Sequence, residues 1–339
     1  MGSQPNHFGG ARPTKQLGKT VAKLALGTIL LYYVLHSQMI DFKSLGPALL
    51  SPRTLCLSLS FLLFSATICA FRWYLLATAQ GLTVSYRTMF ELTMIGNFFN
   101  TFLPGSVGGD FIKAWYIASH SAHNKTRAVF TVILDRIIGL AVIVFYSAFS
   151  LCLFTEILKT DHRLQMIGYS VWAFTTVAFL GALIFYSPYV WKQPWFNDLF
   201  SKLEGFGPLG KVVQAAVLYR KRLGTIIKAT LLSSVSVLGI TTLYVLHGQT
   251  LGISLPIARY FFVIPVGLVA SAIPLLPGGI GVGQVAFFTL FRLVGETPEH
   301  GATLCTLLQL HTIFFNCAGF IFYFKYKQPN GNKAYTVPV

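Results

Sequence analysis

The sequence predicts an all-α membrane protein: a polytopic bundle of about six spanning helices with two broken helical elements. Three observations lead to this prediction. Hydrophobic residues make up 54% of the 339-residue chain and charged residues only 11%, against about 25% charged in soluble domains. Long apolar segments alternate with short basic ones. A glycine–proline motif occurs twice inside apolar sequence, as LPGSVGG from Leu103 and as LPGGIGVG from Leu276.

The apolar segments set the number of spanning helices, because a helix needs about 20 mostly apolar residues to cross the hydrocarbon core. Six segments approach that length: Val21–His36, Leu55–Ala79, Ala128–Phe154, Met166–Tyr186, Ile226–Leu246 and Ala302–Phe324. We expect a single transmembrane domain over residues 20–325, with polar tails at residues 1–19 and 326–339.

A polar connection at residues 188–225 separates the fourth and fifth segments. Its apolar side chains recur at roughly helical spacing, which fits a helix lying in the headgroup plane and equally fits an ordered loop. These side chains are Trp191, Trp195, Phe196, Leu199, Phe200 and Leu203.

The basic residues set the expected orientation, because lysine and arginine concentrate on the cytoplasmic side. The chain has 26 of them against 10 aspartates and glutamates. Most fall on one side if six helices span and each broken element enters and leaves by the same face. Both termini and the polar connection are then cytoplasmic. Short basic runs between apolar segments indicate contact with anionic lipid headgroups, and nucleic acid is not an expected partner.

The two broken elements, Phe90–Ala118 and Ile257–Val294, interrupt the pattern of spanning helices. The first breaks at Pro104 into arms of about 13 residues, too short to cross the core. The second has longer arms, and its first arm is nearly long enough to cross. Three spans separate the two elements, so they enter from opposite faces. We therefore expect two re-entrant hairpins in an inverted repeat, as in transporters with a site between their repeats.

The first break has the chemistry of an anion site. Pro104 ends the first arm, and Gly105, Gly108 and Gly109 permit a tight turn with close backbone approach. The second arm starts near Ser106, so its free N–H groups and positive dipole end are predicted to face the membrane interior. Such a helix end favours phosphate or carboxylate.

Polar side chains add to both breaks. Asn97 and Asn100 would supply amide donors, and Lys113, three residues after Asp110, would supply a cation or neutralise that carboxylate. The second break offers similar backbone with the neutral side chain of Gln284. Its other predicted site residues are Pro277, Gly278, Gly279 and Gly281. The alternative is that the glycines only let helices pack closely; the repetition of the motif favours a binding site.

Two adjacent charges, Asp135 and Arg136, lie inside an apolar span. Charge at the centre of a membrane helix costs about 2.5–3.5 kcal/mol on insertion scales and normally faces a partner or a cavity. Adjacent residues project about 100° apart, so different partners are expected. Arg136 is predicted to bind a lipid phosphate through its planar guanidinium. Asp135 is expected to pair with Lys113, to couple to protons, or to pin its helix to the hairpin as a static ion pair.

Four further residues stand out in apolar surroundings. Arg72 is predicted to extend towards the cytoplasmic surface in a structural role, and Arg292 is a weaker candidate for the outer end of the cavity. His247 and His311 are expected to pack or to form a helix–helix hydrogen bond. We expect no metal and no cofactor, because the chain contains no CxxC, HExxH, GxSxG or GxxxxGK[ST] motif.

The ordered set NFFNTFLPGSVGGDFIKAWYI, VILDRIIGL and PLLPGGIGVGQ resembles the membrane region of lysylphosphatidylglycerol synthase/flippase proteins, over about residues 20–325. The resemblance implies a bacterial inner-membrane protein that translocates a lipid or lipid-linked glycan. Relatives are also associated with polyprenyl-phosphate sugar and hopanoid pathways. The family pattern falls on Asn100, Pro104, Gly105, Gly108, Gly109 and Asp110, on Asp135, Arg136 and Gly139, and on Pro277 to Gly281.

The chain departs from the family pattern at two positions. Gln284 stands where many relatives have glutamate, which argues against coupling through a carboxylate there. Lys113 stands where arginine is frequent, which weakens bidentate phosphate recognition. The soluble aminoacyl-transferase domain of the full-length synthase is also missing from the sequence, so lysyl transfer is not expected.

We therefore expect a flippase-type transporter, not an enzyme, that moves an anionic phospholipid or a polyprenyl-phosphate-linked lipid between the two hairpins. The alternatives are a membrane enzyme or accessory subunit in lipid-linked sugar, hopanoid or headgroup modification, and a scaffold that recruits partners. Expected protein partners are a second copy of the chain or an enzyme of lipid biosynthesis.

Overall fold

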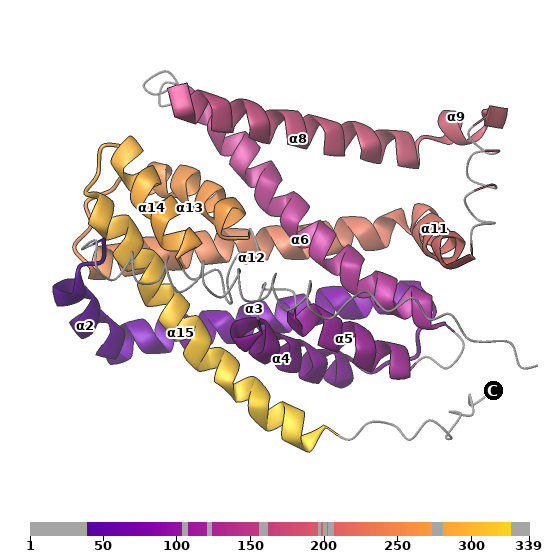
Figure 1. Cartoon of the computed structure of the whole chain (residues 1–339), viewed down its shortest axis with the longest axis horizontal. Helices are drawn as coiled ribbons and strands as arrows, with labels where there is room; N and C mark the ends of the chain where they lie inside the picture. The colour runs from indigo at the N-terminus through magenta and orange to yellow at the C-terminus, as the bar shows by residue number, and fades with distance from the viewer. Residues whose placement is uncertain are drawn as a thin grey trace, which may run out of the picture.

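A computed structural model of the chain describes residues 39–103, 108–120, 124–155, 162–195, 198, 202, 207–272 and 281–326. All regular secondary structure in these residues is helical (Figure 1). The long helices are α3 (Pro52–Ala79), α6 (Lys125–Leu153), α8 (His162–Tyr186), α12 (Leu223–Thr250) and α15 (Pro298–Lys325). The prediction of a polytopic all-α membrane bundle is confirmed.

Five helices in the described residues are long and apolar enough to cross a membrane. They match five of the six predicted spans to within a few residues at each end. Two of them start at a proline, Pro52 and Pro298, where the missing N–H group costs nothing because the first turn of a helix has no internal acceptor for it. The sixth predicted span, Val21–His36, lies outside the described residues.

The shorter helices form two pairs at the predicted breaks. The first pair is α4 (Tyr86–Phe102) with α5 (Gly108–Ser119), and the second is α13 (Ile257–Ser271) with α14 (Val282–Leu293). In the first pair Gly96 and Asn100 of α4 lie against Gly109 of α5, and Gly96 also lies against Lys113. The arms therefore run antiparallel. We call this pair the first hairpin.

The second pair is built in the same way. Gly267 of α13 lies against the ring of Phe287 on α14, and Ser271 lies beside Gly283. These arms also run antiparallel, and we call the pair the second hairpin. The expectation of one arm nearly long enough to cross is wrong for α13, which has only 15 residues, about 22 Å at 1.5 Å per residue.

The helix order α3–α4–α5–α6, here called the first unit, is repeated as α12–α13–α14–α15, the second unit. The helices contain 28, 17, 12 and 29 residues in the first unit and 28, 15, 12 and 28 in the second. Lys125 and Pro298, which begin α6 and α15, are 173 positions apart, as are Leu103 and Leu276 of the repeated motif.

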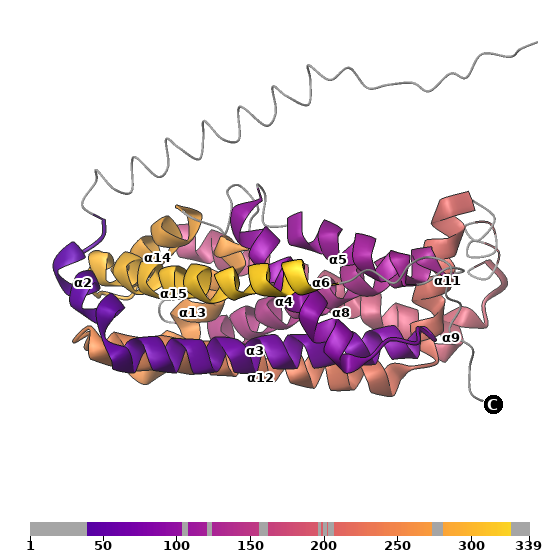
Figure 2. The ribbon, with the colours of Figure 1, turned by 90° about the horizontal axis from the view of Figure 1, so that it is seen from below.

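Packing between the units follows the same correspondence. Helix α3 packs along α12, α4 packs against α15, and α13 packs against α6; Figure 2 shows α3 and α12 side by side along the length of the molecule. The last long helix of each unit therefore packs against the hairpin of the other unit. These contacts between the units hold both hairpins in one bundle.

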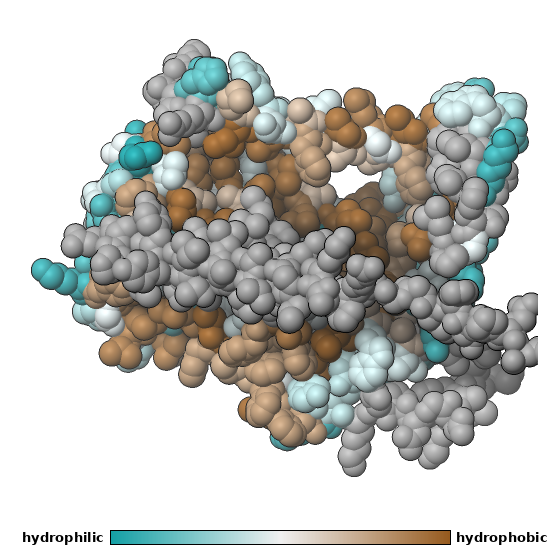
Figure 3. All heavy atoms as spheres, in the orientation of Figure 1, coloured by the Kyte–Doolittle hydropathy of each residue, from teal (hydrophilic) through white to brown (hydrophobic). Residues whose placement is uncertain are grey.

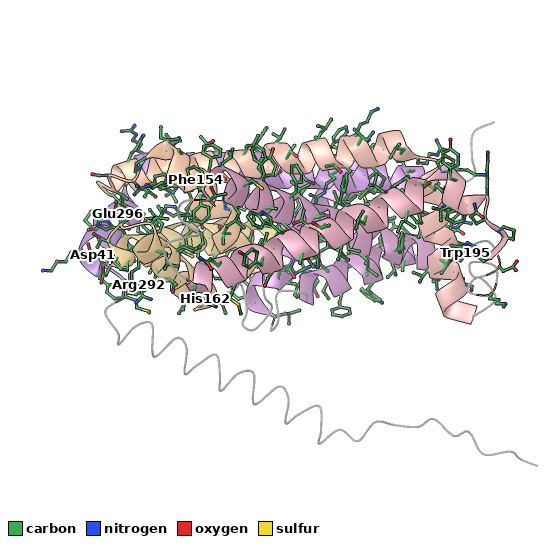
Figure 4. The ribbon with its side chains drawn as sticks, turned by 90° about the horizontal axis from the view of Figure 1, so that it is seen from above. Asp41, Phe154, His162, Trp195, Arg292 and Glu296 are labelled. Carbon is green, nitrogen blue, oxygen red and sulfur yellow. The ribbon has the colours of Figure 1, made fainter. Side chains whose placement is uncertain are left out.

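Helix α8 differs from the other long helices. It packs against α6 and stands apart from the rest of the bundle (Figure 1), with most of its apolar side chains exposed. Apolar exposure of this extent fits a helix that faces lipid. Hydrophobic side chains dominate the visible middle of the molecule and hydrophilic ones its two ends (Figure 3). Asp41, Arg292 and Glu296 lie at one end and Trp195 at the other (Figure 4).

Three short helices were not predicted: α2 (Phe42–Leu50), α9 (Pro188–Trp191) and α11 (Gly207–Arg220). Helix α11 lies within the polar connection and packs against α6 and α12. The Tyr219 hydroxyl donates to the Leu76 carbonyl at 2.7 Å, and Gln80 Nε2 donates to the Ala215 carbonyl at 2.7 Å. Burial raises the pKa of Tyr219, so this hydroxyl keeps its proton and remains a donor. Most of residues 196–206, which carry much of the predicted interfacial pattern, lies outside the described residues.

Candidate functional site

The arms of the first hairpin approach each other through two glycines. A Cβ atom on Gly109 would lie 2.7 Å from the carbonyl carbon of Gly96 and closer still to its oxygen, so backbone meets backbone here. A Cβ on Gly96 would in turn overlap the Lys113 side chain, 2.8 Å from its Cγ. Only glycine permits such contacts. This contact is the close helix packing that was the alternative to a binding role for Gly109, and Gly96 is a residue that the sequence did not single out.

The start of α5 is capped by a side chain. The Gly109 N–H donates to Asn100 Oδ1 at 2.8 Å, so this amide is occupied and not free for a ligand. Asn100 thus serves here as an acceptor, where the sequence suggested a donor. The physical reason is that the first N–H groups of a helix have no partner within it, and a nearby side-chain oxygen satisfies one of them. Asn97, one turn before, is half-buried on α4.

Three charged side chains gather beside this cap. Arg136 of α6 donates through Nη1 to Asp110 Oδ2, and Lys113 Nζ lies 4.0 Å from Asp110 Oδ1. Their side chains are 33%, 17% and 11% exposed for Arg136, Asp110 and Lys113. The structure therefore brings together the predicted residues of the hairpin and of the charged span. One carboxylate and two cations leave this cluster with a net positive charge.

Lys113 is held by more than its ion pair. Its ammonium lies 5.5 Å from the centroid of the Trp73 ring on α3, within the range of a cation–π interaction. The stem of the side chain passes over Gly96. Trp73 is itself 1% exposed and donates through Nε1 to Thr131 Oγ1 at 3.0 Å. The cation is thus positioned by three helices, and Trp73 joins the site as a residue not predicted from the sequence.

Asp135 has a different partner from the ones predicted. Arg72 of α3 binds it through two parallel hydrogen bonds, Nε to Oδ1 at 2.6 Å and Nη2 to Oδ2 at 2.9 Å. Arg72 Nη1 also donates to Ser233 Oγ of α12 at 2.7 Å. The pairing with Lys113 is wrong, and the ion pair joins α6 to α3 and α12, not to the hairpin. The adjacent residues Asp135 and Arg136 do have different partners, as predicted.

The position of Arg72 also corrects a prediction. Its side chain is 8% exposed, so it does not extend to the surface; instead its charge is neutralised inside the bundle. A buried carboxylate beside it makes this favourable, because bidentate geometry satisfies both groups. Arg292, the weaker candidate, is exposed and lies at the same end of the molecule as Asp41 and Glu296 (Figure 4).

The second hairpin has a neutral counterpart of the first cluster. Gly281 adopts φ 86°, a left-handed conformation that favours glycine. Its N–H donates to Gln284 Oε1 at 2.7 Å, and Gln284 Nε2 donates to Gln309 Oε1 of α15 at 2.5 Å. The side chain of Gln284 is buried and serves as a helix cap tied to α15, where the sequence suggested a ligand-binding group. The predicted site residues Pro104, Gly105, Ser106, Pro277, Gly278 and Gly279 lie outside the described residues.

Helix α15 contacts the ends of both hairpins. Asn316 Nδ2 donates to Thr101 Oγ1 near the end of α4 at 2.8 Å, and Gln309 binds the second hairpin. Asn316 and Gln309 are seven residues apart, two turns or about 10 Å along one helix face. The described ends of the two hairpins therefore contact α15 about two turns apart, and the charged cluster of the first hairpin contacts α6.

A separate cavity of about 480 Å³ lies between α6 and α8. Its walls include Phe145, Phe149 and Trp172, and no charged side chain lines it. Such a surface suits hydrocarbon but not a headgroup. Among the described residues no three His, Cys, Asp or Glu side chains converge as a metal site would require.

Residues 20–319 match the family described as the lysylphosphatidylglycerol synthase TM region. The chain belongs to this family. The match covers both units and the connection between them, and it confirms the resemblance drawn from the three motifs. It also agrees with a multi-pass membrane protein, as the five long apolar helices indicate.

The chain is also similar to a UPF0104 membrane protein of Methanocaldococcus jannaschii, with 24% identity over 100 residues. That alignment covers 29% of this chain and 30% of the relative. No solved structure matches the chain.

Proposed function

We propose that the protein is a flippase-type lipid transporter that binds an anionic headgroup at Asp110, Lys113 and Arg136. The observation that carries the proposal is the composition of this cluster: two cations contact one carboxylate inside an apolar bundle, at the end of a broken helix. The acyl or isoprenoid tail would remain in the bilayer, for which the apolar walls between α6 and α8 are suited.

The net positive charge is the main support for an anionic ligand. Charge inside a membrane protein is expensive and is kept where it has a function or a partner. Asp135 and Arg72 neutralise each other completely, and that pair has the character of a structural element. The neighbouring cluster is different, because its described members are one carboxylate and two cations. A phosphate group would balance the second cation and could displace Asp110 from Arg136, whose planar guanidinium binds phosphate oxygens in pairs.

The arrangement of the two units supports transport over static binding. Matching helix lengths, a spacing of 171 to 174 positions between the starts of corresponding helices and the exchanged packing of α6 and α15 are what an inverted repeat would produce. Neither hairpin has an arm of 20 residues, so re-entrant insertion from opposite faces is the economical topology. Rocking of one unit against the other would then open the site to each side in turn.

The orientation in the membrane follows from the distribution of basic residues. With re-entrant hairpins, both termini and the polar connection face the cytoplasm. We place the protein in the inner membrane of a bacterium, with membrane lipid as its main partner. A second copy of the chain or an enzyme of lipid biosynthesis is the expected protein partner.

The decisive experiment measures transport by the purified full chain in vesicles. A fluorescent phosphatidylglycerol in phosphatidylcholine vesicles reports translocation, because an external quencher reaches only the outer leaflet. Asp110→Ala combined with Arg136→Ala should reduce translocation to the rate of protein-free vesicles while the protein still inserts. The matched control is Arg87→Ala with Glu91→Ala, which removes an exposed ion pair from the same hairpin. Wild-type transport by the first double variant would show that the site is elsewhere.

The rival function is a membrane enzyme that acts on a lipid phosphate, with Asp110 as its base. Both charged neighbours of Asp110 in the described residues are cations, so this carboxylate has the position of a counter-ion and no second carboxylate stands beside it there. Incubation of the purified protein with polyprenyl phosphate and a sugar nucleotide separates the two functions. A glycosylated lipid product would favour the enzyme, whereas translocation of the polyprenyl phosphate without a product would favour the transporter.

A further inference from the structure

A second polar cluster lies apart from the anion site. Ser58 of α3 stands between two histidines, with Oγ 2.6 Å from His247 Nε2 on α12 and 2.8 Å from His311 Nδ1 on α15. The three residues are 0%, 0% and 2% exposed. The helix–helix hydrogen bond predicted for the two histidines is therefore present, and it runs through a serine. The cluster joins the first unit to the second.

The partners of the cluster fix the direction of its hydrogen bonds when both rings are neutral. His311 Nε2 lies 3.3 Å from the Leu49 carbonyl, and a carbonyl can only accept, so this nitrogen carries the proton. His311 Nδ1 is then an acceptor and receives the Ser58 hydroxyl proton. The Ser58 oxygen in turn accepts from His247 Nε2–H. Each neutral imidazole has one donor and one acceptor, so His247 Nδ1 is left as an acceptor.

This last acceptor, His247 Nδ1, is the open position at the end of the chain of hydrogen bonds. His247 Nδ1 is buried and has no hydrogen-bond partner. Leaving a buried polar atom unsatisfied costs free energy, and such an atom in a folded protein calls for an explanation. His247 Nδ1 is therefore the nitrogen of this cluster at which an added proton would bind.

The geometry allows one added proton for the pair. The ring centroids of His247 and His311 are 5.9 Å apart, so two positive rings would repel each other in a medium of low dielectric. Interacting groups of this kind titrate as a unit. A metal site is a poor alternative, since no third His, Cys, Asp or Glu joins the pair among the described residues. A nucleophilic serine would need access for a substrate, and Ser58 is fully buried.

The charged and titratable neighbours of the pair do not occupy its open position. On α13 the Tyr260 hydroxyl packs against Gly248, the residue after His247. From α2 the backbone carbonyl of Leu49 faces the pair. The charged groups of the surrounding helix ends have other recorded contacts or are exposed: Asp41 with Lys43 and Ser44, Arg259 with the Val294 carbonyl, Glu296 with His300, and Arg53 at the surface.

We propose that Ser58, His247 and His311 form a proton-binding relay that links the two units of the bundle. A proton binds His247 Nδ1. The His247 Nε2–H bond then breaks as its proton passes to Ser58 Oγ, and the Ser58 hydroxyl proton passes to His311 Nδ1. The positive charge moves from His247 to His311, His247 is left neutral with its proton on Nδ1, and Ser58 regains its hydroxyl.

The relay would make the contact between α12, α3 and α15 sensitive to protonation. It shares no residue with the anion site and does not depend on the identity of the transported molecule. A proton gradient could act on the packing of the units through it, because the two rings lie on different helices of the second unit and the serine lies on the first.

The test is ¹⁵N NMR of histidine-labelled full-length protein in lipid nanodiscs, with His247→Gln and His311→Gln used for assignment. At neutral pH both rings should carry the proton on Nε2. Between pH 8 and pH 4 the wild type should bind one proton more than the double variant His247→Gln with His311→Gln. A neutral His247 that carries its proton on Nδ1 at neutral pH, or a difference of zero or two protons, would overturn the proposal.

A serine variant tests the relay itself. In Ser58→Ala the proton should stay on His247, and the His311 signal should no longer change with pH. The matched control is Ser150→Ala, which removes another buried serine whose hydroxyl bonds only to the Ser147 carbonyl. A charged His311 in Ser58→Ala would overturn the relay. Should Ser58→Ala not fold, the tautomers and proton count of the wild type still decide the question.

Discussion

The two hairpins have the same architecture but differ in charge. Both consist of antiparallel arms with glycines at the contact and a side-chain amide that binds the backbone at the start of the second arm, Asn100 in the first hairpin and Gln284 in the second. The first faces Arg136 on α6, whereas the second faces Gln309 on α15 at the corresponding position, 173 residues later. A shared backbone design thus supports a charged centre on one side only, which is the expected basis for binding an anion there.

The same difference extends to the buried ion pair of the first unit. At the spacing of 173 positions, Arg72 and Asp135 fall on Val245 and Leu308 of the second unit; counted from the helix starts, Arg72 falls on Leu243. All three second-unit residues are buried in one apolar core cluster. One unit therefore fills this place with charge and the other with hydrocarbon. Because the second unit has apolar side chains at these positions, we expect the first unit to fold with an apolar pair there as well.

The largest expected effect is the loss of one member of this pair. Arg72→Val leaves Asp135 buried without its partner and should lower the free energy of unfolding by about 3–5 kcal/mol. Arg72→Val with Asp135→Leu copies the second unit and should lose much less. Thermal and denaturant unfolding in detergent measures both, with the exposed Arg87→Ala as control. A double variant as unstable as the single one would show that the units do not tolerate the same core.

The next effect compares the glycines of the two hairpins. Gly109→Ala places a Cβ against the backbone of Gly96, whereas Gly283→Ala meets only the side chains of Cys305 and Ser271, each at 3.0 Å. Because backbone cannot move aside as a side chain can, Gly109→Ala should cost about 3 kcal/mol, the upper end of the usual range for overpacking. Gly283→Ala should cost less than about 1 kcal/mol by the same reasoning.

Unfolding temperatures of the two variants in detergent test this difference. Gly181→Ala on α8, where nothing lies within 4 Å of the added Cβ, is the control for a change without contacts. Equal stability of Gly109→Ala and Gly181→Ala would show that the first hairpin is more open than the structure indicates.

The third prediction makes the first hairpin resemble the second. Arg136→Gln introduces the residue found at the corresponding position of α15 and removes one cation of the anion site. Hydrogen bonds to charged groups contribute about 1.5–3 kcal/mol, so retention of anionic lipid should fall tenfold or more. Mass spectrometry of lipid that copurifies with each variant measures this. Unchanged lipid in Arg136→Gln would contradict the proposed site, and Gln309→Ala serves as the control at the neutral hairpin.

The smallest effect concerns the caps that the two hairpins share. Asn100→Ala and Gln284→Ala each remove the acceptor for a backbone N–H and should cost about 1 kcal/mol, as other helix caps do. The loss of stability should be slightly larger for Gln284→Ala, because this variant also lacks the hydrogen bond to Gln309. Denaturation midpoints of the two variants give the comparison. A difference of several kcal/mol between them would mean that the two caps are not equivalent.

Hydropathy and length predicted the long helices well, because a spanning helix is a local property of about 20 consecutive residues. The breaks were also visible, since proline and several glycines cluster there and disfavour a continuous helix, whereas the isolated Pro265 lies inside α13. The pairing of Arg72 with Asp135 was not predicted, although both charges were noticed. They are 63 residues apart, and the sequence showed Lys113 as an equally available partner. Helix α2 was missed because a nine-residue helix has a weak local signal, and α11 because its apolar side chains do not gather on one face.

The anion site was predicted in part. Asp110, Lys113 and Arg136 were identified because charge in apolar sequence is rare, and the structure brings them together. The roles of Asn100 and Gln284 were misjudged, because a polar side chain near a helix start can bind either a ligand or the helix itself. Gly96 and Trp73 had no signal of their own, since glycine and tryptophan are common in membrane helices.

By itself the sequence determined the class of the protein, the five described long helices and the two breaks, because these follow from the transfer of consecutive side chains into lipid and from backbone groups that proline and glycine leave unpaired. Only the tertiary structure decided which charges meet. Arg72 with Asp135, Arg136 with Asp110, and Ser58 between two histidines are contacts between distant segments, and their choice depends on how whole helices pack.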